Sequence, residues 1–134
     1  MSERPKDYSY YHDYAWAAAQ NEGVDPALFV RQIDLESGFD PNALSPAGVV
    51  GIAQIVPEFH PEVDPYDPEA SLRYAARLMR EYLDHFGGDY AKALAAYNSG
   101  RGRVDRGVRR YGDRWWLILP EETRRYLRLI LYGG

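Results

Sequence analysis

Signals that begin and end α-helices recur along this chain of 134 residues, whereas the alternation of apolar and polar residues typical of β-strands is scarce. A first helix is expected over residues 8–22, because Gly23 supplies the left-handed residue that commonly ends a helix. A second is expected over residues 26–37, capped by Asp25 and ended by Gly38. The sequence therefore predicts an all-α fold.

The same signals predict four more helices, separated from the first two by a long loop. Residues 39–68 are rich in Pro, Gly and Asp, and only residues 51–56 are apolar enough to form a short buried turn. Long ordered loops within small domains are often functional. The further helices are expected over residues 68–86, 90–98, 104–111 and 120–131, with Gly100 and Gly102 as breaks.

Composition indicates a folded protein whose core is not cross-linked. Hydrophobic residues make up 46% and charged residues 27% of the chain, which contains no cysteine and therefore no disulfide or thiolate site. This length predicts one domain, residues 1–134. No apolar run approaches the ~20 residues that span a bilayer, and the first 14 residues do not resemble a signal peptide. We therefore expect no membrane insertion, and we expect a monomer.

Charge is distributed unevenly along the chain. Residues 1–100 contain 7 basic and 16 acidic side chains, a net charge of -9, whereas residues 101–134 contain 9 arginines and 4 acids, a net charge of +5. The arginine-rich part could face an anionic polymer or neutralise the acidic part, and we favour neutralisation. With a pI of about 5.3 and no recognition motif, nucleic acid is not an expected partner.

One carboxylate interrupts an apolar stripe of the second predicted helix. Phe29, Ile33 and Glu36 share a helix face by their i, i+4, i+7 spacing. A solvated glutamate at a helix end is the ordinary interpretation. However, the helix dipole and partial burial both disfavour the charged form there and so are expected to raise the pKa of Glu36. A carboxyl group that holds a proton at neutral pH can act as a general acid in glycosidic-bond cleavage.

Several further segments accompany this glutamate in a recognisable order. They are Glu36-Ser37-Gly38-Phe39-Asp40-Pro41, then Ser45-Pro46-Ala47-Gly48 leading to Gly51-Ile52-Ala53-Gln54, then Ala95-Ala96-Tyr97-Asn98-Ser99-Gly100, and finally Glu122-Thr123-Arg124-Arg125-Tyr126. In this order the chain resembles the lytic transglycosylase family over about residues 14–132. It departs from the family pattern at Ala53, where methionine is usual, at Ser71 and Ala75, and in a short stretch at residues 57–68.

The resemblance implies a lysozyme-like α-helical domain with a long ordered loop region, which cleaves the bond from N-acetylmuramic acid to N-acetylglucosamine in peptidoglycan. Glu36 matches the family's catalytic acid, which protonates the glycosidic oxygen and then accepts the proton of the muramic C6 hydroxyl, giving a 1,6-anhydro sugar. Neither a cofactor nor a second carboxylate is implied. The remaining matches imply substrate-binding residues: Ser37, Gln54, Tyr97, Asn98, Glu122 and Tyr126.

Two alternative functions stay open from sequence. A lysozyme-type hydrolase would share the fold, the acid and the substrate and would differ only in using water as the attacking group. A non-catalytic wall-binding or virion structural module would keep the fold alone. The histidines lack ligand-like spacing, and no calcium-loop pattern is complete, so we predict no metal site. We expect action at the bacterial cell wall, for which a phage lysis or tail-associated enzyme, or a domain of a longer protein, is a suitable context.

Overall fold

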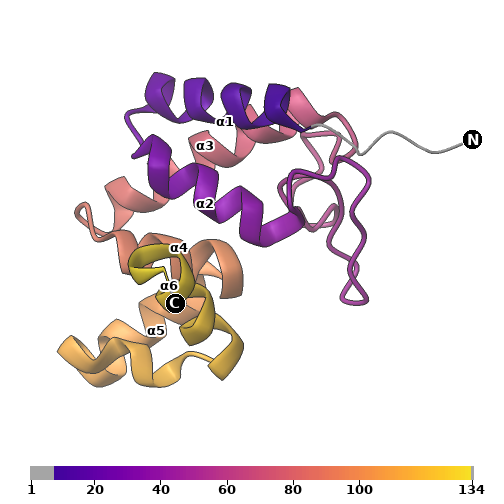
Figure 1. The fold of residues 1–134 in the computed structure, drawn as a ribbon. Coiled ribbons are helices and arrows are strands. Elements are labelled where there is room, and N and C mark those ends of the chain that lie inside the picture. The colour runs from indigo at the N-terminus through magenta and orange to yellow at the C-terminus, as the bar shows by residue number, and fades with distance from the viewer. Residues whose placement is uncertain (1–7, 134) are drawn as a thin grey trace, which may run out of the picture. The chain divides into compact units, whose positions relative to one another are not determined.

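The computed structural model describes residues 8–133, which form six α-helices and one 3₁₀-helix (Figure 1). The α-helices are α1 (Ser9–Glu22), α2 (Pro26–Ser37), α3 (Pro68–His85), α4 (Tyr90–Ser99), α5 (Arg101–Tyr111) and α6 (Glu121–Tyr132), and the 3₁₀-helix is η1 (Gly112–Ile118). Within the described residues, β-structure is limited to isolated bridges in the loop after α2. The predicted all-α class is confirmed. The chain divides into two compact units, Met1–Ala76 and Arg77–Gly134, with the division inside α3.

Local capping explains where the first two helices end. Gly23 has a φ of 68° and Gly38 a φ of 61°, and both lie in the left-handed region. The Gly38 N–H donates to the carbonyl oxygen of Asp34, which would otherwise lack a partner at the end of α2. At the start of α2, the Asp25 carboxylate accepts a hydrogen bond from the Leu28 N–H at 3.2 Å. The predicted helix ends are confirmed here, with α1 beginning at Ser9.

In the first unit α1 packs along α2, as Figure 1 shows for the indigo and purple helices. Small residues on α1, including Ala15 and Ala19, are fully buried and allow the helices to approach closely. From α2, Phe29 and Ile33 fill this core. The core continues into the loop that follows, where Ile52, Ala53 and Ile55 are buried, so the buried turn predicted at residues 51–56 is confirmed.

Gly51 lets the middle of this loop pack against the segment near its end, at Pro65. Gly51 has a φ of 82°, and an added Cβ atom would lie 1.8 Å from the carbonyl oxygen of Pro65. Backbone atoms at that separation cannot coexist with a side chain, so only glycine fits. Two reciprocal backbone hydrogen bonds between Val50 and Ile55, each 3.0 Å, close the turn that follows Gly51. The buried turn is therefore locked both to itself and to the Pro65 segment.

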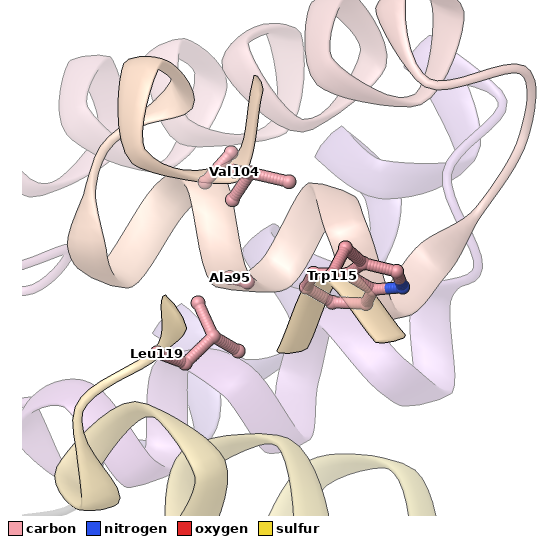
Figure 2. Close-up of a cluster of buried hydrophobic side chains, with 5 residues drawn as sticks. Ala95, Val104, Trp115 and Leu119 are labelled. Carbon is pink, nitrogen blue, oxygen red and sulfur yellow. The ribbon is translucent and has the colours of Figure 1, made fainter. Parts of the chain in front are cut away.

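The second unit is built around α4, whose residues 93–96 are all buried. Figure 2 shows the side chains of Val104, Trp115 and Leu119 gathered around α4 at Ala95. Alanine-rich helices have little side-chain bulk, so α5 and α6 can both pack against α4. This cluster, which also includes Ala96, forms the core of the unit.

The prediction for α5 was wrong at its start, and η1 was not predicted. Gly100, with φ 99° and ψ 136°, separates α4 from α5 on its own, so α5 begins at Arg101 and contains Gly102 as an exposed helical residue. The 3₁₀-helix η1 then folds back onto α5. It does so at Gly107, where an added Cβ would lie 2.5 Å from the Trp115 carbonyl oxygen.

The described residues contain neither a candidate membrane-spanning helix nor a candidate metal-binding cluster. None of the helices between residues 8 and 133 combines the length and the apolar character required to cross a bilayer. Within the same range, histidine and carboxylate side chains do not gather in groups of three or more that could hold a metal ion. The prediction that the first 14 residues do not form a signal peptide falls partly on residues 1–7, which lie outside the described residues.

Replacing Gly51 with alanine is expected to destabilise the protein by about 3 kcal/mol or more, because the new side chain meets the Pro65 carbonyl and the backbone is left-handed. Gly48→Ala is the matched control, since Gly48 has a similar φ of 81° and open space around it. That control should lose only about 1 to 2 kcal/mol. Urea denaturation measures both values, and equal losses would contradict the proposed close approach.

Gly107→Ala tests the packing of η1 on α5. The added methyl group would overlap the Trp115 carbonyl and the Ile118 side chain, which costs about 2 kcal/mol and exceeds the gain of about 1 kcal/mol in helix propensity. The exposed Gly102, in the same helix, should instead gain up to about 1 kcal/mol when changed to alanine. Thermal unfolding should give shifts of opposite sign, and a stabilised Gly107→Ala variant would show that η1 does not pack there.

Candidate active site

Glu36 is the penultimate residue of α2 and continues its buried face. Ile33 and Phe29, one and two turns earlier, are 0% and 1% exposed, whereas Glu36 is half-buried. The apolar stripe predicted from the spacing is therefore confirmed, and it ends in a carboxylate. A carboxylate that is only partly exposed keeps access to a ligand while losing some of its hydration.

Gln32 lies one helical turn before Glu36 and was not predicted as a site residue. Its side chain is 1% exposed, and its Nε2 atom has no hydrogen-bond partner among residues 8–133. Buried amide groups in proteins are nearly always hydrogen-bonded, so this one is unusual. The i, i+4 spacing of Gln32 and Glu36 was the available signal, since it extends the same helix face.

Ser37 connects the end of α2 to the buried turn that follows it in the first unit. Its Oγ donates a hydrogen bond of 2.6 Å to the carbonyl oxygen of Ile52 and lies 3.5 Å from the carbonyl oxygen of Ile33. A hydroxyl group has a single proton, which the short bond to Ile52 uses. Ser37, the residue after Glu36, therefore attaches the end of α2 to the 51–54 turn.

Gln54 lies in that turn and has a strained backbone. Its φ is 51°, in the left-handed region that few non-glycine residues occupy. The Nε2 atom donates to the carbonyl oxygens of Gly51, at 2.9 Å, and Ala43, at 3.4 Å. From sequence alone, both the NH₂ group and the carbonyl oxygen of the Gln54 side chain could bind a ligand. In the structure, the NH₂ group donates to the protein's own backbone. The carbonyl oxygen Oε1 is the end of this side chain that can accept a hydrogen bond from a ligand.

The loop beyond Gln54 is anchored to α3. The Ser71 Oγ donates to the Asp64 carbonyl oxygen at 3.1 Å, and Ser71 is fully buried, which gives this departure from the family pattern a structural role. The Tyr74 hydroxyl donates to the Glu62 carboxylate and lies 2.6 Å from the His60 Nδ1. The hydrogen bond from Tyr74 lowers the pKa of Glu62 below its ordinary value, because it stabilises the charged carboxylate.

The second unit contains the other four predicted residues. Tyr97 and Asn98 lie at the end of α4 and are both half-buried. Tyr126, on α6, is buried at 5% exposure, whereas Glu122 is exposed in the first turn of that helix. A carboxylate in a first turn interacts favourably with the helix dipole, which is a sufficient structural reason for Glu122.

Thr123 determines how the Asn98 amide is oriented. Its Oγ1 donates a 2.8 Å hydrogen bond to the Asn98 Oδ1, and Thr123 itself is 2% exposed. With Oδ1 engaged, the Nδ2 hydrogens of Asn98 are the part of the amide left to donate to a ligand. Thr123 lies within the fourth matched segment, so the signal was present, but no role was assigned to it from sequence.

An open groove of about 460 Å³ lies elsewhere in the first unit, between the start of α1 and α2. Its lining residues are Tyr8, Ser9, His12, Ala27, Val30, Arg31, Asp34 and Phe39. None of the seven predicted site residues lines it. On α2 the groove residue Asp34 is about 200° around the helix from Glu36, so the groove and the glutamate use different faces.

Comparisons with known proteins agree with the predicted family. Residues 13–115 match the protein family described as "Transglycosylase SLT domain". The chain is 33% identical to the membrane-bound lytic murein transglycosylase D of Escherichia coli K12, over 94% of this chain and 33% of that protein. It is 31% identical to the transglycosylase of Enterobacteria phage PRD1, over 69% of this chain and 36% of that protein. The chain thus spans about a third of the length of these relatives.

A solved structure supports the fold. The lytic transglycosylase Slt of Pseudomonas aeruginosa matches 89% of this chain and 22% of its own, with a TM-score of 0.76 and 24% sequence identity. The predicted lysozyme-like helical fold is thereby confirmed. The family match covers most of the chain, including Glu36, Ser37, Gln54, Tyr97 and Asn98. The chain belongs to the transglycosylase SLT domain family.

Proposed function

We propose that this chain is a peptidoglycan lytic transglycosylase that cleaves the β-1,4 bond between N-acetylmuramic acid and N-acetylglucosamine, with Glu36 as its sole general acid and base. The observation that carries the proposal is the half-buried carboxylate at the end of an otherwise buried stripe of α2, in a chain of this family. The names of the two relatives, a lytic murein transglycosylase and a phage transglycosylase, support the same substrate class.

The proposed reaction moves one proton out and one proton back. The Glu36 carboxyl group gives its proton to the glycosidic oxygen as the bond to the muramic anomeric carbon breaks. The resulting carboxylate then accepts the proton of the muramic C6 hydroxyl, whose oxygen attacks the same carbon. The acetamido oxygen of the substrate assists the positive intermediate. A 1,6-anhydro sugar forms, no water is consumed, and no cofactor is required.

The other two candidate residues of the first unit have distinct proposed roles. Ser37 acts as a positioning residue, because its hydroxyl proton is used by the Ile52 carbonyl. Gln54 binds the sugar through Oε1, which would accept a hydrogen bond from a hydroxyl or amide of the glycan. The backbone strain at Gln54 is consistent with a binding role, since such residues cluster where ligands are held.

Substrate-binding roles are also proposed for the four residues of the second unit. Asn98 would donate from Nδ2 to a carbonyl group such as the acetamido oxygen of a sugar. Tyr97, which is half-buried, would place its ring or hydroxyl against the glycan. Tyr126 is buried, so its proposed role is to orient the reacting groups. Glu122 is exposed and would act at the periphery of the bound strand.

The proposal extends to where the protein acts and what it binds. Peptidoglycan glycan strands are the proposed binding partner, and nucleic acid is not. The protein is proposed to act as a monomer at the bacterial cell wall. The phage relative is consistent with a role in phage lysis or in a phage tail. A lysozyme-type hydrolase, in which water replaces the C6 hydroxyl, is the second candidate because it would use the same half-buried acid.

Glu36→Gln should reduce the rate of lysis by about 100-fold to 10,000-fold, because the amide cannot transfer the proton. A glutamate-to-glutamine variant of the P. aeruginosa Slt is described as inactive, so the change has a precedent within the fold. Asp34→Asn is the matched control on the other side of α2 and should keep nearly full activity. Clearing of purified peptidoglycan measures both rates. If a folded Glu36→Gln variant lyses normally, the protein is not an enzyme of this mechanism.

Thr123→Val should disturb the orientation of the Asn98 side chain, although Thr123 is not itself proposed to contact the substrate. Loss of the 2.8 Å hydrogen bond frees the Asn98 amide to rotate and leaves Oδ1 without its partner, so we expect roughly a tenfold drop in the rate of muropeptide release. Thr123→Ser keeps the hydroxyl and should stay within about threefold of the original rate. Initial rates on peptidoglycan, with circular dichroism to verify folding, make the test. Equal rates for the two variants would remove Asn98 from the site.

A further inference from the structure

Three arginines of α5 are not explained by the proposed catalytic reaction. Arg106, Arg109 and Arg110, here called the arginine face, lie within an arc of about 100° when α5 is viewed along its axis. All three side chains are exposed. The segment from residue 101 to residue 114 contains six arginines and two aspartates, so it has a net charge of +4.

The charge of the arginine face is not neutralised within the described chain. No carboxylate oxygen of residues 8–133 lies within 4.0 Å of these guanidinium groups. The one acid on α5, Asp105, is 2.8 Å from His85 and 3.9 Å from Arg101. Arg110 contacts the Tyr111 ring, at 5.5 Å from its centroid. For these three arginines, the described residues do not show the neutralisation of the acidic part that the charge distribution leads us to expect.

The apolar side of α5 is already used inside the protein. Val104 is fully buried in the cluster with Trp115 and Leu119, as Figure 2 shows, and Gly107 is buried against η1. A helix that binds a bilayer inserts an apolar face beside its basic one. The exposed large apolar side chains described on α5 are limited to Val108 and Tyr111, which are 36% and 38% exposed and do not form an apolar face. Its chemistry therefore fits a hydrated polyanion better than a lipid surface.

We propose that the arginine face binds the carboxylate groups of peptidoglycan stem peptides, a proposal that rests on the peptidoglycan substrate put forward above. A guanidinium group forms two parallel hydrogen bonds with a carboxylate, and arginine is the side chain best suited to this geometry. Stem peptides repeat along each glycan strand, so several weak contacts act together. The face holds the enzyme on the wall and takes no part in bond cleavage.

Co-sedimentation with purified insoluble peptidoglycan tests the proposal. The protein is used as Glu36→Gln, so that the wall is not digested during the measurement. The combined variant R106Q, R109Q and R110Q should bind at least about fivefold more weakly at low salt, since exposed ion pairs each contribute modestly. The difference should shrink at high salt, which screens exposed charges. R106K, R109K and R110K together should bind with a strength between those of the parent and the glutamine variant, because the charge is kept but the paired hydrogen bonds to a carboxylate are lost.

The matched control removes the same charge from other helices. Arg77 on α3 and Arg125 and Arg128 on α6 are also exposed, and R77Q, R125Q and R128Q together should bind within about twofold of the parent. A second test uses peptidoglycan whose carboxylates have been converted to amides. The parent protein should bind this amidated wall as weakly as the arginine-face variant binds native wall. Circular dichroism verifies folding, and R109Q alone serves if the combined variant fails to fold.

Several outcomes would overturn the assignment. Unchanged binding of the arginine-face variant, or unchanged binding to amidated wall, would exclude the stem carboxylates. An equal loss in the control would show that net charge alone matters. Tighter, face-dependent binding to vesicles containing phosphatidylglycerol, or to duplex DNA, would assign the surface to that partner instead. Because these measurements use a Glu36→Gln protein, they are independent of whether the active protein is a transglycosylase.

Discussion

The hydrogen bond from Ser37 to the carbonyl oxygen of Ile52 is the contact on which the proposed chemistry of the first unit depends. It joins the last residue of α2 to a turn that lies fifteen residues further along the chain, so Glu36 and the Gln54 turn are positioned by one framework. That turn is fixed in its own right, because Gly51 packs its backbone against Pro65. A general acid is effective only when its proton is within hydrogen-bond reach of the substrate, and this framework limits where the Glu36 carboxyl group can lie.

Among the described residues, left-handed backbone at non-glycine residues occurs at two positions, and both lie in the first unit. Phe39 and Gln54 are non-glycine residues with φ values of 63° and 51°, and both lie within segments that resemble the family. Each such residue costs of order 1 kcal/mol or more, which the surrounding hydrogen bonds and buried side chains must offset. By contrast, the strongly basic helix of the second unit is unstrained on its exposed side. Cleavage and wall attachment thus have separate proposed origins, one at the end of α2 with the loop that follows it and one on a face of α5.

Helix positions could be predicted from sequence because the signals that end helices are local. Asp25, Gly23 and Gly38 act on residues within four positions of themselves, and each acts as predicted. The errors involve contacts that only the tertiary structure provides. Gly102 is tolerated within α5, and η1 forms because it can pack on Gly107. The residues adjacent in sequence to Gly102 and to η1 reveal neither result.

For the candidate site, sequence supplied the residue types but not their hydrogen bonds. The matched segments identified Ser37, Gln54 and Asn98, yet their partners are Ile52, backbone carbonyls across a turn, and Thr123 on another helix. These partners decide which atoms of each side chain are engaged within the protein and which are left to form other hydrogen bonds. Gln32 escaped notice because buried glutamines are uncommon and its spacing alone carries no chemistry.

The identity of the nucleophile is the central claim, and the mass of the products tests it most directly. Purified peptidoglycan is digested in water labelled with heavy oxygen, and the muropeptides are separated and weighed. If the C6 hydroxyl of the sugar makes the new bond, the muramic ends are lighter than reducing ends by one water and carry no label. Reducing muramic ends that contain one labelled oxygen would contradict this mechanism and would assign the chain to the hydrolases.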